Sequence, residues 1–405
     1  MKKRVLKKRV RRFVGGALAC GLVVASLGTS ASARRSHAPL QGEGEGLKLV
    51  ANIKYPGGSD MEFATIKGHD YAFTGSLDSQ KGGLRVINID NPERPKLVTH
   101  LACAMSQADI QISHDQKTLI MAADSAGGPA ACLMTGKLGF MTVDISNPKR
   151  PKPIGVAQIP RGSHNTTAHP TKPYVYNSDS DLGGRGEIQI WSIKNPAKPK
   201  LVNTVPSAPH SPHDISFNKK GNLAVTAAIS HFDLFDTSDP ENPQLIFTGQ
   251  CPGCSITHDA KFTPDGTHII IGDEGGGGAP YPCPGGALYF YLLQSNVPTL
   301  VGAYEPAVFV SAQGGLGGCT AHVFDISDDS KKLSISWYTA GTRYLDISEP
   351  HGFTLGGNTA GTGPTELGWF IPKNADSWSS KMHRGPYIYS NDLVRGFDVF
   401  RIAKK

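Results

Sequence analysis

One short motif recurs along the chain and constrains its fold more than any other feature of the 405-residue sequence. Each copy reads as an alternating apolar strand, a turn with Asn-Pro or Asp-Pro, and a second short strand. The clearest copies cover residues 84–98, 140–155, 188–203 and 232–247, degenerate copies cover 288–302 and 342–356, and a truncated copy covers 396–405. Proline cannot donate to a sheet ladder, so it suits these turns and edges. Repetition at a steady period predicts a repeat architecture.

A further pair of short strands precedes each copy, as at residues 213–217 and 223–227. Each unit therefore contains four strands, which we expect to run from the centre of the molecule outward. Seven units of about 53 residues follow from the length, slightly more than the usual propeller blade of roughly 40–50 residues. The excess lies in loops between the second and third strands, such as residues 275–286. The sequence predicts an all-β, seven-bladed β-propeller.

The two ends of the repeat array complement each other. The final copy, residues 396–405, stops before its fourth strand, whereas residues 47–53 form an unpaired strand of the fourth-strand type. An N-terminal strand that completes the last blade would close the ring and remove its exposed sheet edges. We therefore expect a single propeller over residues 46–405, preceded by a flexible leader at 34–45.

The motif of three apolar residues followed by Asp, Ile or Val, Ser, Asn or Asp and Pro resembles that of the LVIVD-repeat family of secreted bacterial propellers. The resemblance covers about residues 46–405 and is clearest in the first four copies of the repeat. It implies the propeller fold. It implies no particular reaction, because the family has no common established activity.

The first 33 residues have the pattern of an export signal. Residues 1–12 carry eight basic side chains and no acid, residues 13–27 are apolar, and Ala31-Ser32-Ala33 offers small residues for cleavage. We expect a secreted protein that is cleaved near Ala33. Because the net charge of +7 includes those eight cations, the remainder is near neutral. This balance argues against a nucleic-acid partner, and the apolar stretch is too short for a membrane span.

Six cysteines remain after the signal, an even number that favours disulfides in an exported protein. We expect Cys103 and Cys132 to tie one blade together. Two of the other four could link the fifth blade internally, but their pairing cannot be deduced. Cys251 and Cys254 have the spacing of a redox or zinc motif; without a second such pair, a loop disulfide is favoured.

Alignment of the first two strands of each unit reveals a column of histidines. His164, His213, His258 and His322 each lie ten residues before the start of a second strand, in units three to six. The innermost strands of a propeller line its axis, so four imidazoles should converge at one mouth of the channel. Neutral imidazole binds zinc, copper and other metals and also acts as a general base. The column predicts a site for a divalent ion (calcium, manganese, zinc or copper); the alternative is a polar, water-bonded filling of the axis.

Other side chains are expected to approach this mouth from the loops. Asp273 and Glu274 are the strongest acidic candidates, with Asp124, Asp179 and Asp181 as further ones. Asp214 and Asp259 follow two column histidines and are expected to point away from the axis. Arginines recur near the same rim, at Arg85, Arg185, Arg343 and Arg395. Guanidinium groups bind carboxylates in bidentate fashion, which suggests a uronic acid as substrate. Ordinary exposed positions remain the alternative for these arginines.

Three functions are compatible with these features. The first is a polysaccharide lyase for extracellular uronate-containing glycans, because several lyases use propellers with histidine-bound metal. There His213 or His258 would take a proton, Tyr338 would protonate the leaving oxygen and Arg343 would neutralise the carboxylate.

The second is a copper-dependent oxidase similar to the selenium-binding and methanethiol oxidase propellers. The third is a non-catalytic binding scaffold. That scaffold would bind a ligand or a protein. We expect a monomer whose partner is an extracellular carbohydrate or small molecule.

Overall fold

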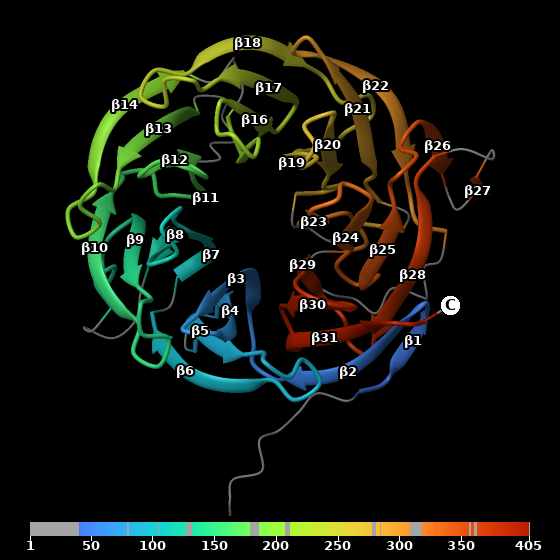
Figure 1. The fold of residues 1–405 in the computed structure, drawn as a ribbon, viewed down its shortest axis with the longest axis horizontal. Coiled ribbons are helices and arrows are strands. Elements are labelled where there is room, and N and C mark those ends of the chain that lie inside the picture. The colour runs from blue at the N-terminus through green and yellow to red at the C-terminus, as the bar shows by residue number, and fades with distance from the viewer. Residues whose placement is uncertain are drawn as a thin grey trace, which may run out of the picture. The chain divides into compact units, whose positions relative to one another are not determined.

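Alternating strands form seven sheets around a central axis (Figure 1). The computed structural model describes residues 40–404 except 79–80, 104, 127–131, 179–185, 207–210, 278–280, 284, 308–317, 356–357 and 360–362. Within these ranges the predicted all-β, seven-bladed propeller is confirmed. The signal sequence predicted at residues 1–33 lies outside the described residues. No helix among the described residues is long and apolar enough to cross a membrane.

Four blades have the expected four strands, which follow one another from the axis outward. Blade one contains β3 (Gly58–Ile66), β4 (His69–Ser76), β5 (Gly83–Asn88) and β6 (Lys96–Ala102), and blade two contains β7 (Met105–Ile112), β8 (Thr118–Ala126), β9 (Gly139–Asp144) and β10 (Lys152–Gln158). Blade three contains β11 (Asn165–Ala168), β12 (Tyr174–Ser178), β13 (Glu187–Ser192) and β14 (Lys200–Pro206), and blade four contains β15 (Asp214–Phe217), β16 (Leu223–Ala228), β17 (His231–Asp236) and β18 (Gln244–Gly249).

The remaining three blades recruit strands from elsewhere in the chain. Blade five contains β19 (Thr257–Phe262), β20 (His268–Asp273), β21 (Leu288–Gln294), β22 (Val297–Tyr304), β26 (Gly352–Leu355) and β27 (Asn358–Thr359). Blade six contains β23 (Phe324–Ile326), β24 (Lys332–Ser336), β25 (Thr342–Asp346), β28 (Thr365–Pro372) and β1 (Gly42–Glu45), and blade seven contains β29 (Ser377–Met382), β30 (Tyr387–Asp392), β31 (Gly396–Ile402) and β2 (Leu47–Ile53).

The Asp and Asn-Pro positions of the repeat form hydrogen bonds that fix the turn between the two outer strands. In blade two, the Asp144 carboxylate accepts from the backbone N–H of Ser146 at 2.9 Å, and the Asn147 side-chain oxygen accepts from that of Lys149 at 3.2 Å. Asp236 and Asp239 make the same two bonds in blade four, each also to the residue two positions later. These Asx turns explain why the motif needs short polar side chains beside its proline.

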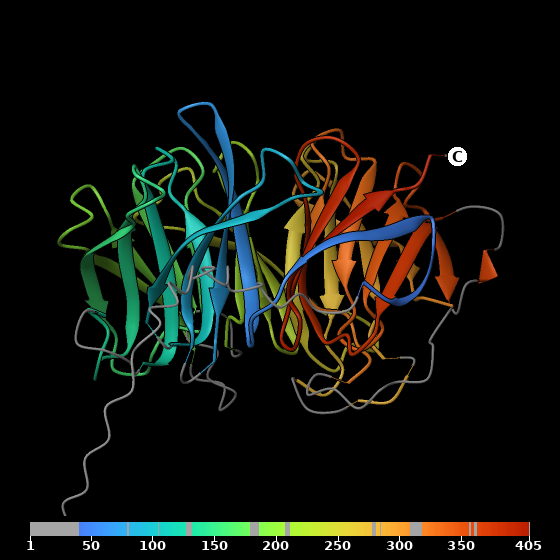
Figure 2. The same cartoon turned by 90° about the horizontal axis from the view of Figure 1, so that it is seen from below.

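The ring is closed by the N-terminal strand, as predicted. Strand β2 pairs antiparallel with β31 and becomes the outer strand of blade seven (Figures 1 and 2). The buried side chain of Asn52 donates to the backbone oxygen of Arg395 at 3.1 Å and to the Asp398 carboxylate at 2.8 Å. Asp398 also accepts from the Arg395 guanidinium at 2.7 Å, so a buried polar network joins the two ends of the chain.

Replacing Asn52 with alanine should weaken this closure. The change removes one donor from the buried Asp398 carboxylate, which keeps its bonds to Arg395, and one from the backbone oxygen of Arg395; loss of such buried hydrogen bonds costs about 1–3 kcal/mol. We therefore expect the free energy of unfolding to fall by about that amount in urea denaturation. The matched control is Asn88→Ala, because the Asn88 amide bonds only the exposed Asp90. Equal effects of the two substitutions would contradict the assigned role of Asn52.

Two outer strands differ from the sequence expectation. Residues 42–45, expected in the flexible leader, form β1 against β28, where a side chain at Gly42 would lie 2.3 Å from the oxygen of Ile371. The outer strand of blade six was expected within 342–356 but is β28, because residues 352–355 form β26 and run parallel to β22 of blade five. A side chain at Gly302 would lie 2.1 Å from the oxygen of Pro350, so glycine permits this close approach.

Disulfides join three pairs of cysteines. Cys103 bonds Cys132 within blade two, as predicted, and Cys251 bonds Cys254 just before blade five. The third bond joins Cys283, in the β20–β21 loop, to Cys319, in the segment that leads into blade six. This bond therefore links two blades. Three disulfides indicate an extracytoplasmic protein, because such bonds persist in oxidising compartments.

Candidate metal centre in the channel

The four column histidines meet at the axis. His164, His213 and His322 each precede an inner strand, and His258 is the second residue of β19. The centroids of successive rings in the series 164, 213, 258 and 322 are 4.4, 4.3 and 4.2 Å apart. The side chains thus form one continuous arc contributed by blades three to six, which is the convergence that the alignment predicts.

Acceptor groups fix the ring orientation of three of these histidines. Nδ1 of His213 lies 3.1 Å from the backbone oxygen of His258, and Nδ1 of His322 lies 2.6 Å from that of Trp378. Nδ1 of His164 lies 2.7 Å from a carboxylate oxygen of Asp124. Carbonyl and carboxylate oxygens can only accept, so each Nδ1 carries the proton. In the neutral rings Nε2 is then left as a lone pair, as in histidine ligands held by outer hydrogen bonds.

These Nε2 atoms lie close to one another and to a buried carboxylate. Nε2 of His164 is 2.9 Å from Nε2 of His213. Glu274, which directly follows β20, has its oxygens 3.7 Å from Nε2 of His258 and 3.8 Å from Nε2 of His322. One ligand atom from each of His258, Glu274 and His322 falls within 4.8 Å of the others, and all three residues are buried. This group could hold a metal ion.

Burial favours the neutral form of three of the imidazoles, those of His213, His258 and His322. It lowers the pKa of His213 and of His258 well below the usual value, and the neighbouring histidines lower both further. Burial likewise lowers the pKa of His322 to about 3. The phenol of Tyr338 donates to Glu274 at 2.7 Å, and its pKa is raised well above the usual value by burial and by the Glu274 charge. At neutral pH the site therefore offers imidazole lone pairs beside a phenol that keeps its proton.

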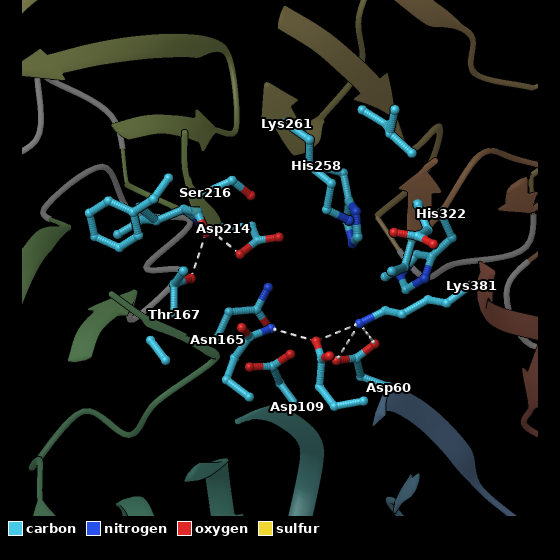
Figure 3. A pocket seen from close by; sticks show the side chains of 18 of the residues that line it. Asp60, Asp109, Asn165, Thr167, Asp214, Ser216, His258, Lys261, His322 and Lys381 are labelled. Atoms are coloured by element: carbon cyan, nitrogen blue, oxygen red, sulfur yellow. Dashed lines mark hydrogen bonds and ion pairs between the residues drawn. The ribbon is translucent and has the colours of Figure 1, made fainter. Parts of the chain in front are cut away.

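A cavity of about 490 Å³ extends from the histidines along the channel (Figure 3). Beyond the imidazoles its wall is polar, and the acidic and lysine side chains that line it are Asp60, Glu62, Asp109, Asp214, Asp325, Lys261 and Lys381. Phe63, Phe217 and Phe262 line the cavity as well. The histidine site is therefore one part of a larger compartment that is rich in carboxylates.

Asp214 was expected to point away from the axis, but it lines this cavity. His213 directly precedes β15, and the first and third residues of that strand, Asp214 and Ser216, both line the cavity (Figure 3). Asp259 does not line the cavity; it is fully buried and pairs with Lys261 at 2.7 Å.

Three acidic side chains of the channel, Asp60, Asp109 and Asp214, form what we call the carboxylate ring. This ring was not identified from the sequence, although the repeat places its members at one equivalent position. Positions one residue after the histidine column are Asn165, Asp214 and Asp259, and the same register gives Asp60 in blade one and Asp109 in blade two. Blades one, two and seven place Ser59, Ala108 and Trp378 at the histidine position itself. The Trp378 ring packs 4.4 Å from the His322 ring, so it borders the arc.

The predicted arginines lie away from the cavity. Arg343 is fully buried, with its guanidinium 3.2 Å from Glu366, and Arg395 pairs with Asp398. Arg85 is 5% exposed and donates to the backbone oxygen of Lys81 at 2.6 Å, over the ring of Tyr55. None of these three lines the cavity. Arg185, Asp179 and Asp181 lie outside the described residues.

Of the predicted loop carboxylates, Glu274 lies beside the histidines, and Asp124 bonds His164. Asp273 is buried, and one of its oxygens accepts from the backbone N–H groups of Ser255 and Ile256 at 2.7 and 3.0 Å. Asp273 therefore supports the segment that leads to His258.

Asp109 provides a test of the channel electrostatics. Burial, and then the carboxylates of Asp60 and Asp214, raise the pKa of Asp109 well above its usual value, against weaker opposing effects of the Thr166 N–H and of Lys381. Because the folded protein holds the Asp109 proton more tightly than the unfolded chain does, Asp109 lowers the free energy of unfolding as the pH rises from the unfolded-state pKa through the folded-state pKa. We expect Asp109→Asn to raise the free energy of unfolding at pH 8 by about 1 kcal/mol or more, since one pKa unit corresponds to about 1.4 kcal/mol. At pH 4 urea denaturation should show little change; a pH-independent effect would contradict the assignment.

Comparisons with known proteins support the fold. No protein-family model and no curated protein matches the sequence. Among solved structures, a functionally unknown protein from Desulfotomaculum acetoxidans superposes with a TM-score of 0.52 at 16% identity, covering 76% of this chain and 88% of that chain. Hydrazine synthase from Kuenenia stuttgartiensis gives a TM-score of 0.61 at 12% identity, with coverage of 83% and 93%. A periplasmic gluconolactonase from Pseudomonas aeruginosa gives 0.54 at 12%, with coverage of 76% and 83%. The chain is thus a seven-bladed β-propeller with distant structural similarity to bacterial propellers, and these likenesses bear on the fold alone.

Proposed function

We propose that this protein is an extracytoplasmic metal-dependent enzyme that oxidises a small molecule in its central channel. The observation that carries the proposal is the 2.9 Å contact between Nε2 of His164 and Nε2 of His213. Both rings have Nδ1 bonded to an oxygen that can only accept. Two bare lone pairs at this distance would repel each other, so the two nitrogens share either a proton or a metal ion; the Gln107 side-chain amide also lies 2.9 Å from Nε2 of His164.

The donor set fits a transition metal. Two imidazole nitrogens bound to one ion at about 2.0–2.1 Å, in adjacent coordination positions, lie about 3 Å apart. His258 and His322 add two further imidazoles, and the 3.7–3.8 Å gaps to Glu274 leave room for the carboxylate to bind or to orient a ligand. Neutral imidazole suits copper, zinc, iron and nickel, whereas calcium prefers oxygen ligands. Among the divalent ions the affinity order favours copper.

The chain's own groups suit an oxidase better than a uronate lyase. A bound copper ion would supply one-electron chemistry, and His164, His213, His258 and His322 would hold it. Tyr338 keeps its proton next to Glu274 and can deliver it to an atom that gains charge. Of the four arginines of the lyase hypothesis, the three that the structure describes bond Glu366, Asp398 and the backbone oxygen of Lys81 and do not line the cavity. The carboxylates of the channel would also repel a polyanion.

The proposal is tested by metal analysis of the purified protein followed by activity assays. We expect about one tightly bound copper ion per chain, with a paramagnetic resonance signal typical of nitrogen ligands, and oxygen consumption with small reduced organic substrates. Ultraviolet absorbance from unsaturated uronate products tests the lyase directly. A protein without bound metal after exposure to copper and zinc would be a scaffold, and uronate cleavage would reinstate the lyase.

A further inference from the structure

We infer that the channel binds a small organic cation, such as an ammonium or guanidinium compound, whose charge rests on Asp109 and Asp214 beside the histidines. As an assignment of substrate class, this rests on the proposed function. As a binding site it stands on the cavity itself, which joins these carboxylates and the imidazoles in one space of about 490 Å³.

The channel lysines are already paired. Lys381 lies 3.1 Å from an oxygen of Asp60 and 2.9 Å from one of Glu62. Lys261 lies 2.7 Å from Asp259 and also donates to the backbone oxygen of Phe324. The ammonium groups of Lys381 and Lys261 therefore form ion pairs with carboxylates other than Asp109 and Asp214.

Among the described residues, the hydrogen bonds that Asp109 and Asp214 accept come from backbone N–H groups. The N–H of Thr166 donates to Asp109 at 2.9 Å, and the N–H of Ile215 donates to Asp214 at 2.7 Å. Within the described part of the chain neither carboxylate forms an ion pair. Burial and the nearby carboxylates Asp60 and Asp214 raise the pKa of Asp109, which is the expected result when negative charge in a cavity lacks a counter-charge.

An independent observation at the same cavity also points to a ligand. Nδ1 of His258 is buried and has no hydrogen-bond partner, although the side chain is 5% exposed and lines the cavity. Figure 3 shows this imidazole directed into the channel, across from Asp109 and Asp214. Buried polar atoms are nearly always paired, so an unpaired one in a cavity wall indicates a missing partner. The donor groups of an ammonium or guanidinium ion match the two carboxylates, and an oxygen of the same molecule can accept from Nδ1 of His258, which carries the ring proton when Nε2 binds a metal.

The remaining wall suits the uncharged part of such a molecule. Phe63, Phe217 and Phe262 line the cavity, and aromatic faces attract both apolar groups and cations. The volume lies within the usual range of roughly 300–1,000 Å³ for small-molecule sites. A cation with a short apolar or aromatic body is therefore favoured over an anion or a polymer.

Three probes of equal shape and different charge test the inference: benzylammonium, benzyl alcohol and benzoate. Calorimetric titration into the full-length protein at pH 7.5 should give a dissociation constant for benzylammonium at least tenfold lower than for benzyl alcohol, and no binding of benzoate. Equal binding of all three, or preference for benzoate, would overturn it. This ranking uses the unaltered protein, so it does not depend on whether a variant folds.

Variants then locate the charge. Asp109→Asn combined with Asp214→Asn should weaken benzylammonium binding at least tenfold and leave benzyl alcohol unchanged. Asp328→Asn, which alters an exposed carboxylate outside the channel, is the control and should have no effect. Undiminished binding in the double variant would place the cation elsewhere.

Metal content measured on the same samples separates the two proposals. Metal without cation preference overturns only this inference, and cation binding without metal overturns only the proposed enzyme.

Discussion

A protein shortened to begin at Lys54 will fail to form a stable ring. Strand β2 buries Leu47, Leu49, Ala51 and Ile53, each 5–7% exposed, and pairs along β31. Burial of one large aliphatic side chain contributes about 1.5–3 kcal/mol, so the three largest together contribute roughly 5–9 kcal/mol. That is comparable with the total stability of about 5–15 kcal/mol expected for a domain. We expect loss of a cooperative thermal transition in circular dichroism and rapid proteolysis.

The matched control begins at Gly46, which removes β1 but retains β2. Strand β1 is exposed along its length, so its loss should lower the melting temperature by only a few degrees. If the protein that begins at Lys54 melts as cooperatively as this control, β2 is not needed to close the ring.

The largest effect on ligand binding is expected from the double substitution His258→Ala and His322→Ala. A four-ligand zinc site contributes about 10–16 kcal/mol in total, or roughly 3 kcal/mol for each ligand. Removal of two ligands should therefore weaken metal binding by about four orders of magnitude, enough to leave the protein free of metal after dialysis. Plasma emission analysis and competition titration with copper and zinc measure this directly.

A second pair of histidines provides the control for that experiment. His268 and His351 lie on the surface with their Nε2 atoms 3.1 Å apart, outside the channel. Replacing both with alanine removes the same number of imidazoles but should leave the tightly bound metal in place. If instead this control loses the metal and the channel variant keeps it, the metal is bound by the surface pair His268 and His351.

The repeat made the fold predictable because each unit carries its own strand and turn signals. The alternating strands and the Asx turns at positions such as Asp144 and Asn147 act locally, so they can be recognised without knowledge of the rest. The closing strand was also predictable, since an incomplete last unit requires a partner. The parallel pairing of β26 with β22 was not, because it depends on the close approach of two backbones at Gly302.

The candidate site could be predicted only in part. The histidine column has one residue type at one position of the repeat, so the alignment reveals it. The acidic positions Asp60, Asp109 and Asp214 alternate with Asn165 in the same register, so no single residue type marks the position, and Asp214 was expected to point away from the axis. The arginines were assigned from their place near loops, whereas Arg343 and Arg395 are held by Glu366 and Asp398, from distant and nearby positions respectively. Such buried partners cannot be identified from residue type alone.

Closure of the ring by the first strand has a consequence for when the protein becomes functional. The network around Asn52 and Asp398 joins positions 346 residues apart, so it forms only after nearly the whole chain is available. Blade seven also supplies Trp378, whose carbonyl orients His322. Contacts of such long range are slow to form. The histidine site therefore reaches its final geometry late in folding, and an ion bound there would be taken from the compartment in which folding ends.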